Sequence, residues 1–220
     1  MKMDMHLHSS HSSDGRISPR DILKQARKNG LGGLCITDHN TMKGNIEARK
    51  IASEFGLLVV RGMEISTTDG HILGYGIDEE VPRDLSPEEA LKNIRGQGGM
   101  AVVPHPYRFW SGLGRKNTLR IKPDAIETIN SHSTSRDNAM ARRLCEQMKL
   151  PMTAGSDSHE TSTIGRAYVI VPDSSSEDDA LRAIRSGKAK VGGLSRNLTG
   201  TLKDRAMGVT RWMGRGFKKV

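Results

Sequence analysis

The sequence predicts an α/β fold in which parallel strands and helices alternate along one chain. Short runs rich in Ile, Leu, Val and Met are separated by helical segments of about ten to fifteen residues, a pattern typical of βα units. Roughly seven or eight such runs are present, which suits a closed or nearly closed barrel. A chain of 220 residues is long enough for one such barrel or for two small domains.

The predicted elements follow one another along residues 3–185. Two predicted helices have Ser as the N-cap, at Ser18 and Ser86. In both, Pro takes the first helical position and an acidic residue the third, which is a strong signal for a helix N-terminus. Gly30 and Gly56 supply stops for the first two helices. Strands are expected at residues 3–8, 34–37, 57–65, 71–77, 100–104, 125–129, 152–154 and 167–171, and helices at 18–29, 41–55, 86–95, 136–149 and 176–185.

The composition indicates a cytoplasmic protein with an aliphatic core. Hydrophobic residues make up 35% of the chain and aromatic residues only 4%. The longest aliphatic run, at residues 57–60, is far too short to cross a bilayer. The N-terminus runs directly into a strand pattern, and no signal peptide is expected there. The two cysteines, Cys35 and Cys145, are far apart in the sequence and fit a reduced compartment.

The net charge of +9 is concentrated at the C-terminal end. Residues 182–220 hold eleven of the 34 basic residues and one of the 25 acids, so the rest of the chain is close to neutral. We therefore predict a barrel at residues 1–192 and a basic tail at residues 193–220. A helix there could contact nucleic acid, an anionic membrane or an acidic partner, or pack on the barrel. Its apolar stripe would be Leu202, Ala206, Val209, Met213 and Phe217.

Histidines and carboxylates gather at the ends of the predicted strands. In β/α barrels the C-terminal strand ends meet at the functional site, and imidazole with carboxylate suits Zn²⁺, Mn²⁺ or Fe²⁺. His71 is the exception, because it begins its strand and needs a preceding bend to reach the others. Enough candidates are present for two or three metal ions: His6, His8, Asp14, His39, Glu64, His71, His105, Asp157 and His159.

This set of motifs resembles the PHP (polymerase and histidinol phosphatase) family of metal-dependent phosphoesterases, and is closest to its trpH-like branch. The resemblance covers about residues 3–172, with the motifs in the family's order. It rests on Asp4-Met5-His6-Leu7-His8, Ser13-Asp14-Gly15, Thr37-Asp38-His39, Gly62-Met63-Glu64, His71-Ile72-Leu73-Gly74, His105-Pro106 and Gly155-Ser156-Asp157-Ser158-His159.

The resemblance implies a distorted (β/α)7 barrel of the PHP type with a trinuclear metal site. By position, the first metal would be held by His6, His8, Glu64 and Asp157. Glu64 would bridge to a second metal held with His71 and His105. The third would be held by Asp14, His39 and His159.

Two departures from the trpH-like branch concern the substrate. Tyr107 stands where that branch has Gly after His-Pro, and the long helical insertion often found before His105 is absent. Arg108 matches an Arg that often follows this motif, so it is the first candidate for binding phosphate. His132 is expected to face the site and to contact substrate. Asp38 and Glu127 are expected to orient ligands or to be structural rather than to bind metal.

The expected activity is hydrolysis of a phosphate ester by a metal-bound hydroxide, with Glu64 and Arg108 as catalytic residues. The substrate would be a nucleotide, an oligonucleotide or a small phosphomonoester. An amidohydrolase-like metal hydrolase is one alternative, but such enzymes usually bridge their metals with a modified Lys rather than a Glu. A non-catalytic metal-binding or nucleic-acid-binding module is another, and the basic tail leaves that alternative open.

Overall fold

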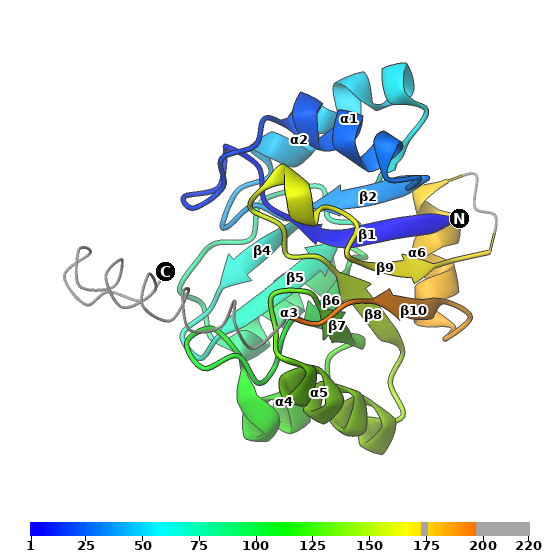
Figure 1. Cartoon of the computed structure of the whole chain (residues 1–220). Helices are drawn as coiled ribbons and strands as arrows, with labels where there is room; N and C mark the ends of the chain where they lie inside the picture. Colours follow the sequence, from blue (N-terminus) through cyan, green and yellow to red (C-terminus); the bar gives the residue numbers. More distant parts are fainter. Residues whose placement is uncertain (173–175, 197–220) are drawn as a thin grey trace.

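Two five-stranded sheets form the centre of the molecule (Figure 1). The structure is a computed structural model that describes residues 1–172 and 176–196. The first sheet has the order β10-β9-β1-β2-β3, and the second has the order β4-β5-β6-β7-β8. The strands are β1 (Lys2–Leu7), β2 (Gly33–Ile36), β3 (Leu58–Val59), β4 (Gly62–Ser66), β5 (His71–Tyr75), β6 (Met100–Val103), β7 (Ala125–Asn130), β8 (Met152–Gly155), β9 (Ala167–Ile170) and β10 (Lys190–Gly193).

Backbone contacts join the two sheets where β1, β2 and β8 end. The residues after β1 and β8 meet at a parallel bridge between Leu7 and Ser158, and the His8 N–H donates to the Ser158 carbonyl at 2.9 Å. A second bridge joins His39, just after β2, to Glu64 of β4. These contacts bring segments that are far apart in the sequence to one end of the molecule.

The α/β class is confirmed, but the strands do not pair as a closed barrel of parallel strands. β4 and β5 are antiparallel, because only residues 67–70 connect them and so short a link cannot cross back over the sheet. β5 and β6 are also antiparallel, and β9 runs antiparallel to both of its neighbours, β1 and β10. The ladders β1–β2–β3 and β6–β7–β8 are parallel, as predicted.

The single strand expected at residues 57–65 is split between the two sheets. Its first part is β3, which pairs with β2, and its second part is β4, which pairs with β5. Asn45 stabilises the point where the chain passes from one sheet to the other, because its side-chain amide donates to the carbonyls of Ile36 at 2.9 Å and Val60 at 2.7 Å. Gly62 is needed next, since a Cβ there would lie 2.8 Å from the Gly74 carbonyl oxygen.

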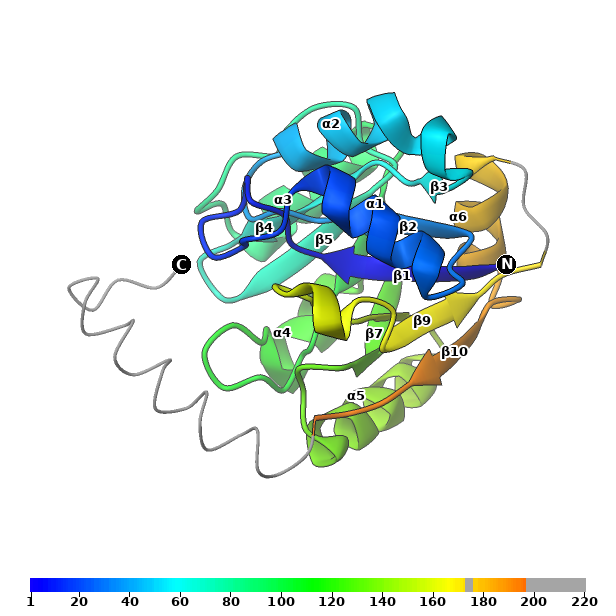
Figure 2. The ribbon, with the colours of Figure 1, turned by 45° about the horizontal axis from the view of Figure 1, so that its top comes forward.

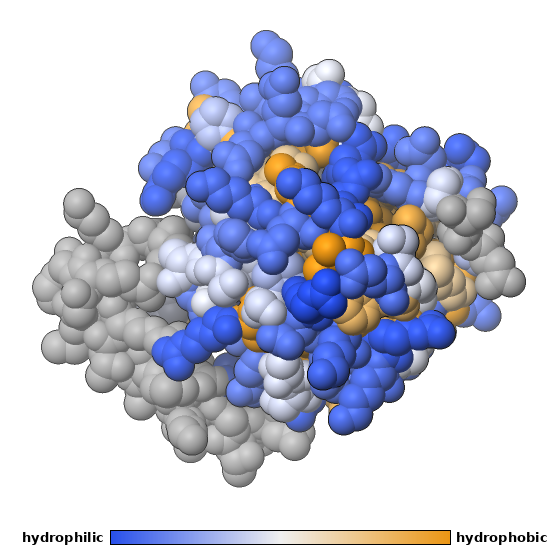
Figure 3. Space-filling model, turned by 90° about the horizontal axis from the view of Figure 1, so that it is seen from above, coloured by the Kyte–Doolittle hydropathy of each residue, from blue (hydrophilic) through white to orange (hydrophobic). Residues whose placement is uncertain are grey.

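Helices cover the outer faces of both sheets. α1 and α2 pack on the first sheet, α3 on β5 and β6, and α5 on β7, whereas α6 lies near the start of β1 (Figures 1 and 2). The outer surface over α1 and α2 is mostly hydrophilic, as expected for helices with their apolar side turned inward (Figure 3). The helices are α1 (Pro19–Lys28), α2 (Lys43–Ile51), α3 (Pro87–Gly96), α4 (Gly114–Ile121), α5 (Ser135–Met148) and α6 (Glu177–Arg185).

The capping signals place α1 and α3 where the sequence predicts them. Ser18 and Ser86 are the N-caps, and Ser86 forms a reciprocal capping box with Glu89. Two observed elements were not predicted, α4 and β10. Leu113 precedes α4 and provides no side-chain cap, so the sequence carries no start signal for this helix.

The core between the two sheets is aliphatic, as the composition requires. Met3, Met5, Leu73 and Met100 are fully buried there, and the Tyr75 hydroxyl donates to the Met5 carbonyl at 2.8 Å. Both cysteines are buried and unbonded to each other. Among the residues described, no helix combines the length and apolar character that a membrane crossing requires. The predicted apolar stripe at 202–217 lies outside the described residues.

Candidate metal centre

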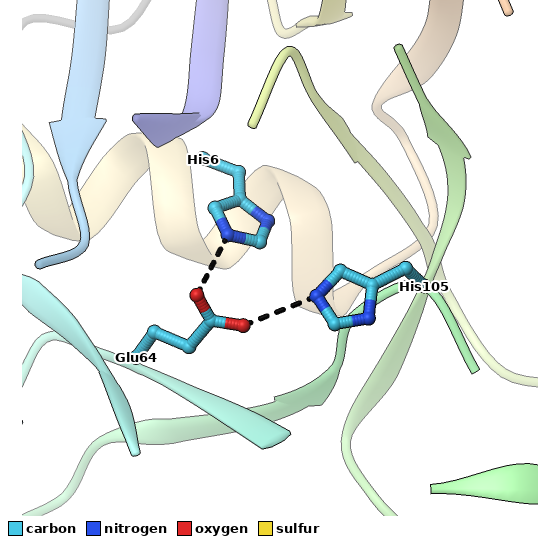
Figure 4. A group of neighbouring side chains, drawn as sticks. All are labelled: His6, Glu64 and His105. Atoms are coloured by element: carbon cyan, nitrogen blue, oxygen red, sulfur yellow. Dashed lines mark hydrogen bonds and ion pairs between the residues drawn. The ribbon is translucent and has the colours of Figure 1, made fainter. Parts of the chain in front are cut away.

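Glu64, in the middle of β4, is the centre of the candidate site. Its side chain is 1% exposed, and five imidazole nitrogens lie within 3.5 Å of its two carboxylate oxygens. Figure 4 shows His6 and His105 directed at its two different oxygens. The distances are 3.1 Å from His6 Nε2, 3.2 Å from His8 Nε2, 3.5 Å from His39 Nδ1, 2.8 Å from His71 Nδ1 and 3.1 Å from His105 Nε2.

Strand geometry explains how these imidazoles converge. His6 is in β1 and His8 directly follows that strand, and residues two apart point to the same face. His39 lies three residues after β2 and is paired with Glu64 through the bridge between the sheets. His71 begins β5, and the β4–β5 hairpin folds it back opposite Ser66. The hairpin is therefore the bend that the sequence requires to bring His71 to the site.

A second carboxylate, Asp157, lies beside the first. Its Oδ1 is 3.3 Å from His8 Nε2 and 3.6 Å from His6 Nε2. Its Oδ2 accepts hydrogen bonds from the side chains of Arg108 and Asn130. Asp157 therefore faces the histidines with one oxygen and polar donors with the other.

A third carboxylate, Asp14, lies at the outer edge of the cluster. Its Oδ2 is 3.0 Å from His159 Nε2 and 3.5 Å from His39 Nε2. The Ser12 hydroxyl donates to its other oxygen at 2.8 Å and also accepts the His39 N–H at 3.2 Å. All nine predicted ligands thus lie in one contiguous cluster.

Charge within the cluster is strongly coupled. Burial opposes ionisation of Glu64, but the neighbouring imidazoles of His39, His6 and His71 hold its pKa well below the ordinary value. Burial likewise opposes protonation of His8, but the carboxylates of Asp157 and Glu64 beside its ring raise its pKa to about 10. In the protein without metal, the buried carboxylates of the cluster are therefore stabilised by nearby positive charge.

The unsatisfied atoms fit divalent metal ions. Nε2 of His8 and Nδ1 of His39 are buried, and neither has a hydrogen-bond partner among the described residues. Both lie within 3.5 Å of Glu64 Oε2 without the geometry of a hydrogen bond. A buried polar atom without a partner is costly, whereas imidazole nitrogen next to carboxylate oxygen is the donor set that Zn²⁺, Mn²⁺ and Fe²⁺ accept.

Glu127 and Asn130 support the ligands from behind. Glu127 Oε1 lies 3.0 Å from His6 Nδ1, and its Oε2 accepts the His105 N–H at 3.0 Å. Asn130 donates to Glu127 and to Asp157. The sequence suggested an orienting role for Glu127, but it gave no signal for Asn130. Metal-binding imidazoles commonly need such a carboxylate on their second nitrogen.

Asp38 has a different partner from the one expected of a residue that orients a histidine. Its two carboxylate oxygens accept the backbone N–H and the hydroxyl of Ser9, at 2.6 and 2.7 Å. Asp38 thus fixes the loop that follows β1.

The two predicted substrate contacts lie at the edge of the cluster. Arg108 is 29% exposed and donates from Nη2 to Asp157 and Asn130. The ring of His132 stacks on that of His159, with 5.7 Å between centroids. Burial lowers the pKa of His132 to about 3, so its imidazole is neutral at pH 7.

Comparison with known proteins agrees with the family resemblance. A protein of Methanocaldococcus jannaschii described as uncharacterised is 41% identical over 143 residues, which cover 60% of this chain and 83% of that protein. A 5'-3' exoribonuclease of Haemophilus influenzae is 36% identical over 105 residues, covering 46% of this chain but only 38% of the enzyme.

The fold also has solved counterparts. A two-domain protein of Bacteroides vulgatus, described as containing a predicted PHP-like metal-dependent phosphoesterase, superimposes with a TM-score of 0.75 at 20% identity, covering 88% of this chain and 65% of that one. Residues 135–189 match the PHP-associated family. Residues 4–151, about two thirds of the chain, match the PHP domain family itself. The chain therefore belongs to the PHP domain family.

Proposed function

We propose that this protein is a metal-dependent phosphoesterase that hydrolyses a nucleotide, an oligonucleotide or a small phosphomonoester. The observation that carries the proposal is Glu64, a buried carboxylate with five imidazole nitrogens within 3.5 Å. A carboxylate has about four lone-pair sites, so hydrogen bonding alone does not account for five imidazoles. Shared metal ions do account for them.

The nine ligands divide naturally among two or three divalent ions. His6, His8 and Asp157 surround one position, and Glu64 with His71 and His105 a second. Asp14, His39 and His159 surround a third. Bound there, the ions would acidify water to supply a nucleophile and would neutralise charge on the phosphoryl group. Glu64, which contacts two of these positions, is the bridging residue in this assignment.

Arg108 is suited to hold the phosphoryl oxygens. Its described side-chain hydrogen bonds use only the two N–H groups of Nη2, which leaves three of the five guanidinium donors for a ligand. Arg and phosphate pair well because the planar fork of N–H groups matches two phosphate oxygens. His132, being neutral, can orient a substrate through a hydrogen bond without adding charge.

The exoribonuclease among the relatives supports a phosphodiester or nucleotide substrate for this chain. Because this chain spans only 38% of that enzyme, the substrate itself is part of the proposal. The competing amidohydrolase-like function is less well supported, since Glu64 occupies the position where a bridging Lys would be expected.

The test combines metal analysis with a substrate panel. Protein stripped with chelator and reconstituted separately with Zn²⁺, Mn²⁺ or Fe²⁺ should bind two to three equivalents. It should then hydrolyse at least one of p-nitrophenyl phosphate, a nucleoside 3',5'-bisphosphate, histidinol phosphate or a short single strand of DNA or RNA. An amide panel run in parallel tests the alternative. Less than one equivalent after reconstitution, or turnover of amides alone, would refute the proposal.

A further inference from the structure

Two adjacent aromatic side chains, Phe109 and Trp110, lie exposed in the loop between β6 and α4 (residues 104–113, here the β6–α4 loop). Phe109 is 84% exposed and Trp110 is 53% exposed, and their ring centroids are 4.8 Å apart with the planes nearly perpendicular. The whole chain has only eight aromatic residues. Leaving a Phe in water forgoes about 1.5–3 kcal/mol of burial free energy, so the exposure of Phe109 calls for an explanation.

The β6–α4 loop is anchored to the metal centre on both sides of the aromatic pair. Immediately before the pair, the Arg108 side chain donates to Asp157. Immediately after it, the Ser111 carbonyl accepts the His71 N–H at 3.0 Å. Asp157 and His71 are both proposed metal ligands. The pair therefore lies at the rim of the centre.

Short backbone contacts also close the loop on itself. The Gly112 N–H donates to the Arg108 carbonyl and the Gly114 N–H to the Pro106 carbonyl, both at 2.9 Å. A Cβ on Gly112 would lie 2.5 Å from the Pro106 oxygen, so only glycine fits there. The aromatic rings are thus presented on a constrained backbone, and ordering such a platform adds little entropic cost to binding.

We propose that Phe109 and Trp110 form a stacking platform for the nucleobase of a nucleotide whose phosphate is held at the metal centre. The inference rests on the proposed phosphoesterase function and names its substrate class. Every base offers a π face, and stacking on an aromatic side chain contributes about 1–3 kcal/mol per base. Phe109 directly follows the proposed phosphate-binding Arg108 in the sequence, so one loop would contact both the phosphate and the base.

The charge around the loop favours a nucleotide over an apolar partner. Arg115 and Lys116 are exposed at the start of α4, immediately beyond the β6–α4 loop. Basic and aromatic side chains on one surface are the combination that single-stranded nucleic acids bind. A protein-docking patch would not require bonds from the same loop to Asp157 and His71.

Kinetics with and without a base test the platform. In the metal-loaded enzyme, the double variant Phe109→Ala/Trp110→Ala should raise KM for adenosine 3',5'-bisphosphate by roughly 5- to 150-fold, the range that about 1–3 kcal/mol represents. Its KM for ribose 5-phosphate, which has no base to stack, should stay within about twofold of the wild-type value. Ile46→Ala, which removes another exposed apolar side chain from α2, is the matched control. Equal changes with both substrates would overturn the inference.

Binding provides a readout that does not depend on turnover. In a Trp212→Phe background Trp110 is the only tryptophan, so its fluorescence reports on the platform. A non-hydrolysable phosphonate analogue of adenosine 5'-phosphate should quench it, whereas the corresponding ribose phosphonate should not. Equal quenching by both compounds would overturn the inference, as would a shift from dimer to monomer in the double variant, since the pair would then be a contact between copies.

The two proposals fail separately. If no phosphate ester is hydrolysed but the adenosine analogue alone quenches Trp110, the phosphoesterase proposal fails and base stacking stands. If ribose 5-phosphate and the nucleotide are hydrolysed equally well, and the double variant changes neither, the platform fails while the phosphoesterase stands.

Discussion

Replacing Glu64 with Gln isolates the charge at the centre of the site. The substitution preserves the shape of a side chain that is 1% exposed, but it removes the negative charge that faces five imidazoles. Gln also offers one acceptor oxygen where Glu offers two, so one of the two proposed metal positions would lose its shared ligand. Both metal affinity and turnover should therefore fall.

The size of the effect follows from burial. Removing one partner from a buried, compensated charge group costs about 3–5 kcal/mol. At about 1.36 kcal/mol per tenfold change in rate, we expect kcat/KM to fall by roughly 10²- to 10⁴-fold. The matched control is Glu47→Gln, because Glu47 is 48% exposed and forms an ion pair with His11 at the surface. An exposed pair contributes at most about 1 kcal/mol, so this control should lose less than about fivefold.

Metal content and hydrolysis of p-nitrophenyl phosphate should be measured on the same reconstituted samples. We expect Glu64→Gln to lose at least one equivalent of metal while keeping the wild-type circular dichroism spectrum. A variant that binds a full complement of metal and works within about tenfold of the wild type would show that Glu64 does not bridge metals.

Three further predictions concern the positioning of His6 by Glu127, the stability of the fold and the basic tail. Glu127→Gln should weaken metal affinity by about 10- to 100-fold, because the carboxylate that faces His6 Nδ1 is lost; unchanged affinity in a chelator competition would contradict this role. Asn45→Ala should lower the free energy of unfolding of the metal-free protein by about 1–3 kcal/mol, since two buried carbonyls lose their donor; urea denaturation with an unchanged midpoint would refute it. Truncation after Arg196 removes six basic residues and one acid. It should leave hydrolysis of a small phosphate ester intact, because every proposed ligand precedes residue 160. It should also weaken oligonucleotide binding most strongly at low salt; equal binding by both proteins at low salt would exclude the tail as a nucleic-acid arm.

Much of the fold could be predicted because its local signals are strong. The capping residues Ser18 and Ser86 locate α1 and α3, and apolar runs locate most strands. The missed elements lack such signals. β10 is Lys-Val-Gly-Gly, a poor strand former that is held by antiparallel pairing with β9. The split of the strand at 57–65 is invisible for a similar reason, since it depends on Asn45 and on contacts between sheets that only the folded chain makes.

The candidate ligands could be named from the sequence because each is tied to a strand end, but their mutual arrangement could not. Two of them illustrate the difference. His105 and Asp157 adopt positive φ angles, of 29° and 55°, a region that non-glycine residues rarely occupy and that costs about 1–3 kcal/mol. Neither His nor Asp in a sequence predicts such a backbone conformation.

The structure over-determines both conformations. The His105 N–H donates to Glu127, and the Asp157 N–H donates to the His6 carbonyl across the junction between the sheets at 2.7 Å. These bonds turn one strand end toward Glu64 and the other toward His6 and His8. Backbone strain at two proposed ligands of one cluster is consistent with a preorganised metal centre. Folding already offsets the free energy needed to bring the ligands together, so the ions would bind side chains that are already in place.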